Sequence, residues 1–145
     1  MIKKRFRDIR TINNNNINNM SNKIITEIPN LAALVNLLAV NPGLVIIKFG
    51  AEWCGPCKKI DPLVDTWFTF APTSVQCCKV DVDDNFELYG FLKTKRQING
   101  IPAIFCYVKG NNHYIPDDIV VGADPNAIND FFNRCMNLVN VESSK

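Results

Sequence analysis

The hydrophobic residues of this chain follow two periods that alternate from residue 23 onward. Short runs rich in Val and Ile, typical of strands, occur five times. Between them, apolar residues recur every three to four positions, which indicates helices with one buried face. The expected strands cover residues 23–27, 44–49, 74–82, 103–108 and 119–121, and the expected helices cover 31–38, 54–70, 83–93 and 125–139.

The order of these elements is typical of an α/β domain. The run at 44–49 is apolar at nearly every position, so it is expected to be a central strand that is buried on both faces. Asn30 and Asp124 are expected to cap the helices that follow them. Asp83 and Asp84 are expected to cap the third helix in the same way. The pattern predicts one mixed sheet with helices on both faces.

Residues 1–22 differ in composition from residues 23–145. Five of the 16 basic residues lie within the first ten positions, and an Asn-rich tract follows them. Such a segment has little apolar surface to offset the entropy of ordering it. We therefore expect a disordered basic tail over residues 1–22 and one domain over residues 23–145. A mitochondrial-type presequence is the alternative interpretation of the tail.

The charge and cysteine content narrow the class of protein. The net charge of +2 reflects the tail, because 11 Lys and Arg stand against 13 Asp and Glu from residue 22 onward. A nucleic-acid-binding domain is therefore not expected. The apolar runs are too short for a membrane span, and no signal peptide is expected. Most of the six cysteines lie in apolar runs, which favours a reducing compartment such as the cytoplasm.

The segment Cys54-Gly55-Pro56-Cys57 lies between a buried strand and a helix. Two intervening residues at a helix start let the two sulfur atoms approach within bonding distance. The first sulfur meets the free N–H groups and the positive end of the helix dipole, which favour a thiolate. Cys54 is thus the candidate nucleophile and Cys57 its resolving partner. A second such motif, which a zinc ribbon needs, does not occur in the sequence, so a redox motif is favoured and no metal is expected.

The segment 51–58, AEWCGPCK, resembles the active-site signature of the thioredoxin family nearly residue for residue. Segments 79–84, 99–102 and 121–123 resemble three later family features in the same order. The resemblance covers about residues 24–140. It implies a thioredoxin fold, with the central mixed sheet described above, and a protein-disulfide oxidoreductase.

The resemblance also implies roles for individual residues. Cys54 would attack a substrate disulfide, and Cys57 would then release the reduced product. A cis proline at position 102 would face the cysteines. The implied partners are disulfide-containing proteins and an NADPH-linked thioredoxin reductase, and we expect a monomer that needs no cofactor of its own. The residues implied to border the substrate groove are Trp53, Gly55, Pro56, Ile101 and Pro102.

The chain departs from the family behind the motif. Lys48 stands where the family usually has a buried acid that helps to deprotonate the resolving cysteine, whereas the accompanying lysine is retained as Lys79. Two ammonium groups near the thiols would lower their pKa and make the protein more oxidising. Two alternatives stay open: Lys48 is buried, neutral and itself the base, or it extends to solvent. Gly50 also replaces an aromatic residue that is frequent in the family.

Three functions therefore remain open from the sequence. The first is a reductase of protein disulfides that works through a dithiol–disulfide cycle of Cys54 and Cys57. The second is a more oxidising disulfide oxidase or isomerase, for which Lys48 is the argument. The third is a binding module that keeps the fold and uses the groove to hold partners, although the presence of both cysteines argues against it.

Overall fold

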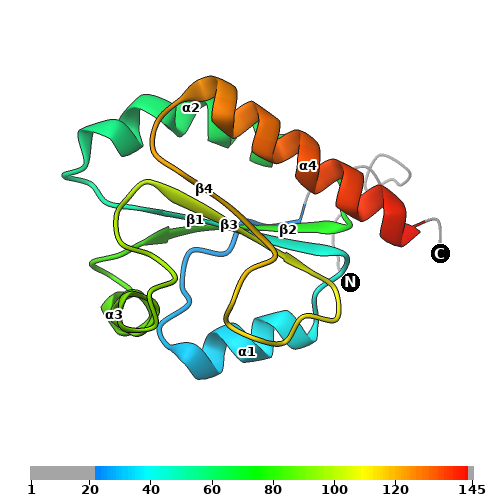
Figure 1. Cartoon of the computed structure of the whole chain (residues 1–145), viewed down its shortest axis with the longest axis horizontal. Helices are drawn as coiled ribbons and strands as arrows, with labels where there is room; N and C mark the ends of the chain where they lie inside the picture. The colour runs from blue at the N-terminus through cyan, green and yellow to red at the C-terminus, as the bar shows by residue number, and fades with distance from the viewer. Residues whose placement is uncertain (1–21, 144–145) are drawn as a thin grey trace.

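The computed structural model describes residues 22–143, so the predicted tail lies, except for Asn22, outside the described residues. Helices and strands alternate over most of this range, as the periodicity predicts (Figure 1). The elements are α1 (Leu31–Ala39), β1 (Leu44–Gly50), α2 (Gly55–Thr69), β2 (Val75–Asp81), α3 (Phe86–Thr94), β3 (Ala103–Val108), β4 (Asp118–Val121) and α4 (Pro125–Ser143).

The four strands form one mixed sheet in the order β2-β1-β3-β4. Strand β1 runs parallel to β2 and antiparallel to β3, and β3 and β4 are antiparallel neighbours. All seven residues of β1 are buried, which confirms the prediction of a central strand covered on both faces. This strand ends at Gly50, so it leads directly into the cysteine motif.

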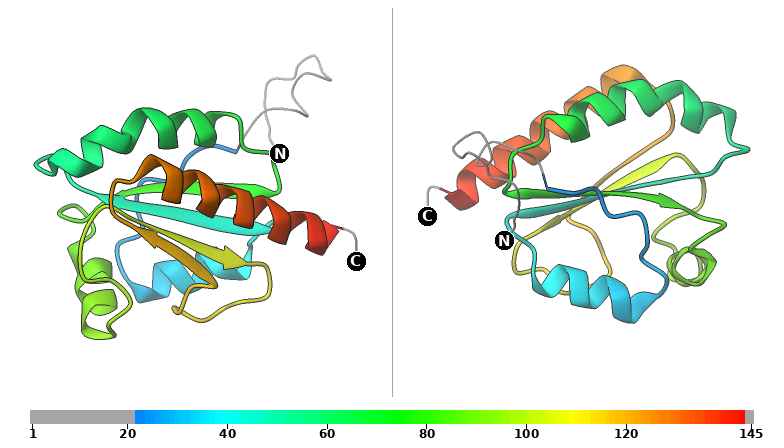
Figure 2. Two further views of the ribbon diagram at one scale, coloured as in Figure 1. Left: turned by 45° about the horizontal axis from the view of Figure 1, so that its top comes forward. Right: turned by 180° about the vertical axis from the view of Figure 1, so that it is seen from behind.

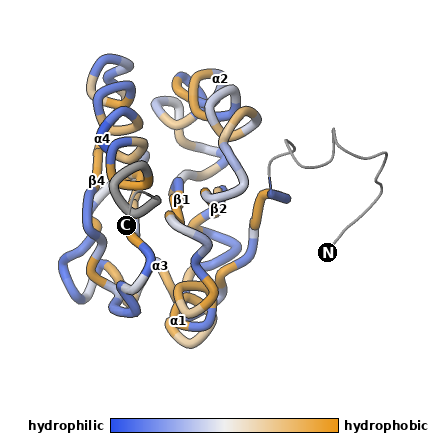
Figure 3. Tube along the Cα trace, turned by 90° about the vertical axis from the view of Figure 1, so that its right-hand side faces the viewer, coloured by the Kyte–Doolittle hydropathy of each residue, from blue (hydrophilic) through white to orange (hydrophobic). Residues whose placement is uncertain are grey.

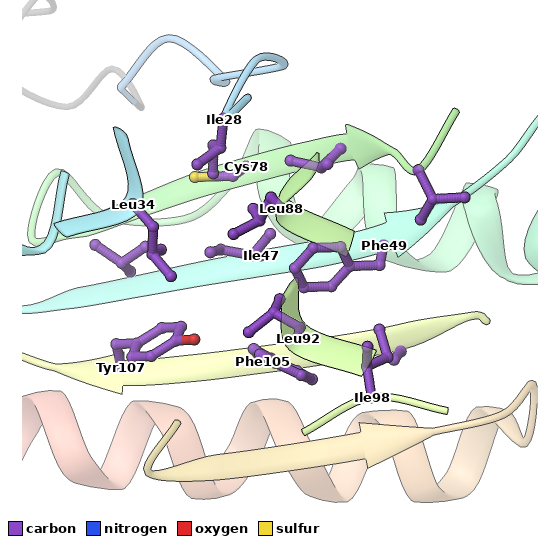
Figure 4. Close-up of a cluster of buried hydrophobic side chains, with 14 of the residues drawn as sticks. Ile28, Leu34, Ile47, Phe49, Cys78, Leu88, Leu92, Ile98, Phe105 and Tyr107 are labelled. Atoms are coloured by element: carbon purple, nitrogen blue, oxygen red, sulfur yellow. The ribbon is translucent and has the colours of Figure 1, made fainter. Parts of the chain in front are cut away.

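Two helices cover each face of the sheet. Helices α2 and α4 lie on one face, and α1 and α3 lie on the other (Figures 1 and 2). Phe68 of α2 and Phe132 of α4 belong to the core on the first face. Leu34 of α1 and Leu88 of α3 pack against the opposite face, where Figure 4 shows them among the side chains of β1 and β3. In Figure 3, hydrophobic and hydrophilic residues alternate around the turns of α4, as expected for a helix with one buried face.

The first predicted strand, at residues 23–27, is wrong. Only Ile25 pairs there, in an isolated parallel bridge with Cys78. The Ile25 N–H donates to Cys77 O at 3.1 Å, and Ile25 O accepts from the Lys79 N–H at 2.8 Å. The chain then leaves the sheet edge, because the Ile28 N–H donates to the Asn85 side chain instead of to β2.

The predicted caps of the third helix are also wrong, whereas the other two caps are confirmed. Helix α3 begins at Phe86, with Asn85 in the N-cap position. Asp83 and Asp84 lie in the turn before the helix, where their N–H groups donate to the Asp81 carboxylate. The Asn30 side chain accepts from the Ala33 N–H at 2.9 Å, and Asp124 accepts from the Asn126 N–H at 3.0 Å.

Asn85 joins the start of α3 to the segment that precedes α1. Its side chain is buried, accepts from the Ile28 N–H at 2.8 Å and donates to Asp81 O at 2.9 Å. We expect Asn85→Ala to lower the free energy of unfolding by about 2 kcal/mol, because it leaves buried polar groups without partners. Chemical denaturation measures this, with exposed Asn99→Ala as the control. A loss below about 0.5 kcal/mol, the usual effect of a surface substitution, would contradict the assignment.

Candidate active site

The end of β1 and the start of α2 place the two cysteines together. Cys54 occupies the N-cap position of α2, and Gly55 and Pro56 are the first two residues of the helix. Proline is favoured at a helix start because the N–H that it lacks has no partner within the helix. The Cys54 sulfur accepts a hydrogen bond from the Cys57 N–H at 3.2 Å. The helix therefore offers this sulfur the electrostatic stabilisation that the sequence predicts.

Cys54 and Cys57 are joined by a disulfide bond. Their Cα atoms lie 5.3 Å apart, within the usual range for such a bond. Both residues are buried, at 5% and 2% exposure, although Gly55 and Pro56 between them are exposed. The site thus presents the motif at the surface while it keeps most of the two sulfur atoms out of water.

One of the predicted groove residues, Ile101, lies beside the Cys54 sulfur. The peptide bond between Ile101 and Pro102 is cis, as the resemblance implies, and Ile101 O lies 4.0 Å from this sulfur. Trp53 is exposed, and its indole N–H donates to the Asp83 carboxylate at 2.8 Å. This role of Asp83 was not predicted from the sequence, where its position indicated a helix cap.

The two lysines of the site lie on neighbouring strands, in register with each other. Lys48 on β1 is only 2% exposed, and its ammonium group forms an ion pair with Asp61 of α2. The alternative that Lys48 extends to solvent is therefore wrong. Lys79 on β2 is partly exposed, and its Nζ lies 3.0 Å from the Asp65 carboxylate and 3.8 Å from that of Asp61.

These ion pairs change the electrostatic picture that the sequence suggests. Each ammonium group faces a carboxylate from α2, so the two lysines do not act as uncompensated positive charges beside the thiols. Asp61 and Asp65 were not predicted as site residues from the sequence. They lie four and eight positions after Cys57, a spacing that places all three residues on one side of a helix. This spacing could have identified the two carboxylates from the sequence.

Gly50 leaves space beside the resolving cysteine. A Cβ atom at this position would lie 3.4 Å from Cys57 Sγ and 3.7 Å from Lys48 Nζ. A cavity of about 640 Å³ occupies this region, and its lining includes Cys57, Lys48, Asp61 and Gly50 itself. The ammonium group and the sulfur therefore lie close to the same point of the cavity wall, and glycine puts no side chain between them.

The other four cysteines are buried. Burial raises the pKa of the Cys77 thiol to about 12, and it also raises the pKa of Cys78. A hydrogen bond with Cys135 and burial together raise the pKa of Cys106. All of these shifts favour the unreactive thiol form. Within residues 22–143, moreover, no three His, Cys, Asp or Glu side chains are grouped so as to hold a metal ion.

The family model named Thioredoxin matches residues 30–134. Thioredoxin-2 from Saccharomyces cerevisiae is 30% identical over 105 residues, which cover 72% of this chain and 92% of the yeast protein. The structure of Trichomonas vaginalis thioredoxin matches with a TM-score of 0.61 at 32% identity, and the match covers 77% of this chain and 96% of that one. The fold and the cysteine pair define a thiol–disulfide oxidoreductase domain. The chain belongs to the thioredoxin family.

Some relatives are considerably longer than the matched region. Thioredoxin M5, chloroplastic, from Oryza sativa is 32% identical over 81 residues, which cover 56% of this chain. The match spans only 42% of that relative's own length, and 41% for the M-type thioredoxin from Brassica napus. The likeness to these proteins thus concerns 81 residues, less than half the length of either relative.

The ion pair of Lys48 predicts that two neighbouring carboxylates, Asp61 and Asp65, contribute differently to the free energy of unfolding. We expect Asp61→Asn to lower the free energy of unfolding by about 2–3 kcal/mol, because it leaves a buried ammonium group without its counter-ion. The loss stays below that of a fully buried pair because the Asp61 side chain is 31% exposed. The matched control is Asp65→Asn, which affects the partly exposed Lys79 and should cost about 0–1 kcal/mol. Equal losses in urea denaturation would contradict this account.

The raised thiol pKa values predict which cysteines react in the native protein. At pH 8, which is four units below the pKa of Cys77, roughly one Cys77 thiol in ten thousand is ionised. Iodoacetamide should therefore leave Cys77 unmodified. Reduction should add Cys54 as the rapidly labelled site. Peptide mapping by mass spectrometry measures this, with the unfolded protein as the positive control. Rapid native labelling of Cys77, Cys78 or Cys106 would contradict the assignment.

Proposed function

We propose that this protein reduces disulfide bonds in other proteins through a dithiol–disulfide cycle of Cys54 and Cys57. The observation that carries the proposal is the disulfide at the start of α2, whose Cys54 sulfur accepts the Cys57 N–H and lies beside the cis-proline loop. A sulfur in this position is suited to act both as an attacking thiolate and as a leaving group.

The cycle consists of two exchange steps. In the reduced protein, the Cys54 thiolate attacks one sulfur of the substrate disulfide, forms a mixed disulfide and releases the other substrate sulfur as a thiolate. Cys57 then loses its proton and attacks the Cys54 sulfur of the mixed disulfide. The second substrate thiolate leaves, and the Cys54–Cys57 disulfide forms. Two electrons pass from the protein to the substrate, and the substrate thiolates take up protons.

The residues around Cys54 form the substrate groove in this proposal. Trp53 supplies an exposed apolar surface that is fixed by its hydrogen bond to Asp83. Gly55 and Pro56 are exposed on the helix side, while the Ile101 backbone and Pro102 form the opposite side. An extended peptide pairs with the backbone next to the cis proline in the manner of an added strand.

The partners and compartment follow from the same proposal. The substrates are proteins that contain disulfides, and a thioredoxin reductase or an equivalent donor returns the two electrons to the Cys54–Cys57 disulfide. The four buried free cysteines fit a reducing compartment, and we propose a monomer. In the part of the chain that the structure describes, no helix is long and apolar enough to cross a membrane.

The charges behind the motif bear on the direction of electron flow. The oxidant alternative requires positive charge at the thiols, but Asp61 and Asp65 oppose the ammonium groups of Lys48 and Lys79. The paired charges support a reductase. We propose that Lys48 and Lys79 hold α2 against β1 and β2, behind Cys57, and thus position the resolving cysteine.

Reduction of insulin with dithiothreitol as the electron source tests the proposed cycle. We expect the wild type to accelerate precipitation of the insulin B chain, and Cys57→Ser to lower the rate to that of dithiothreitol alone, because the mixed disulfide is no longer resolved. Cys77→Ala is the control for loss of a buried thiol and should retain the wild-type rate. Equal, negligible rates for the wild type and Cys57→Ser would leave the binding-module alternative.

A further inference from the structure

A cavity of about 640 Å³ lies beside the resolving side of the disulfide. The cavity beside Gly50 is lined by Cys57, and the described residues that line it do not include Cys54, Trp53 or Ile101. The groove proposed for protein substrates, by contrast, passes Cys54. Gly50 lines the same cavity, and a Cβ at Gly50 would lie 3.4 Å from the Cys57 sulfur, so the cavity lies next to this sulfur.

We propose that this cavity binds a small zwitterionic thiol, which reduces the disulfide by attacking Cys57. The proposal rests on the Cys54–Cys57 cycle proposed above and adds a second entry for electrons. An attacking thiolate approaches a disulfide sulfur from the side away from the leaving sulfur. A cavity that is lined by Cys57 and not by Cys54 provides that approach for Cys57, and the missing side chain of Gly50 keeps it open.

The leaving group favours the same direction of attack. Attack at Cys57 expels the Cys54 thiolate, which the Cys57 N–H stabilises at the helix start. The small thiol forms a mixed disulfide with Cys57. A second molecule of the thiol then attacks the sulfur of the first molecule in that mixed disulfide and expels the Cys57 thiolate. Two small thiols are oxidised to one small disulfide, and the protein disulfide is reduced to a dithiol with uptake of two protons by its thiolates.

The size and charges of the cavity indicate the class of thiol. Its volume lies within the range of about 300–1,000 Å³ that is typical of small-molecule sites. Lys58 belongs to the lining, and its ammonium group suits a ligand carboxylate. Carboxylates of Glu52 and Asp81 also belong to it and suit a ligand ammonium group. An amino acid or short peptide that contains cysteine carries both charges together with the thiol.

Mapping the first intermediate tests the site of attack in the wild type. The oxidised protein is mixed with reduced glutathione as the probe and quenched early with iodoacetamide, which modifies the released thiol. Fragmentation of the peptide that contains both cysteines then locates the two groups. We expect glutathione on Cys57 and the carbamidomethyl group on Cys54. The reverse assignment would overturn the proposal without any concern about the folding of a variant.

Filling the cavity tests the route. We expect Gly50→Phe to lower the second-order rate constant for reduction by glutathione about tenfold or more, because the ring occupies the approach to Cys57. Gly90→Phe is the matched control, because a Cβ at this exposed position of α3 has no neighbour within 4 Å. It should react like the wild type. Unchanged glutathione kinetics in folded Gly50→Phe would overturn the proposal.

The insulin assay separates this proposal from the proposed function. If the wild type reduces insulin and glutathione attacks Cys54, the cavity proposal fails while the protein-disulfide reductase stands. If glutathione attaches to Cys57 and Gly50→Phe blocks it, but insulin is not reduced, the cavity proposal stands and the protein-substrate function fails.

Discussion

The complete burial of β1 is the constraint on which the arrangement of the site depends. This strand lies between β2 and β3, and helices cover both of its faces, so every side chain on it is removed from water. A lysine in such a strand requires a counter-charge, since an isolated buried ammonium group is costly. Asp61 of α2 supplies that charge. The same helix begins at the cysteine motif, so the ion pair also fixes where the motif lies relative to the strand.

Two physical effects thus act on the disulfide from opposite ends. At one end, the start of α2 stabilises negative charge on Cys54 through the Cys57 N–H. At its other end, Cys57 lines a cavity whose wall also contains the Lys48–Asp61 ion pair. The first effect favours a thiolate at Cys54. The second keeps the environment of Cys57 close to electrically balanced despite the lysine, which is why the paired charges support a reductase.

Local sequence patterns predicted most of the fold and the reactive pair. The apolar run of β1, the cap at Asn30 and the cysteine motif each depend on neighbouring residues, and each is present in the structure. The family resemblance implied the cis proline at position 102, whereas the local sequence around Pro102 did not. The family match confirms the thioredoxin fold that the same resemblance implied.

The features that the sequence analysis missed depend on contacts between distant segments. Asn85 bonds to Ile28, 57 residues away, so its local pattern predicted caps at Asp83 and Asp84 instead. The short run at residues 23–27 fails as a strand for the same reason, since the chain turns toward Asn85 after Ile25. The partner of Lys48 depends on how α2 lies across β1, which periodicity alone does not specify.

The most direct measurement of the central claim is the identity of the cysteine that bonds to a protein substrate. Reduced Cys57→Ser is mixed with a disulfide-containing protein, the reaction is stopped with acid, and the mixed disulfide is located by peptide mapping. The account predicts a covalent complex through Cys54 that persists because the resolving thiol is missing. A complex through Cys77, Cys78, Cys106 or Cys135, or no complex at all, would contradict it.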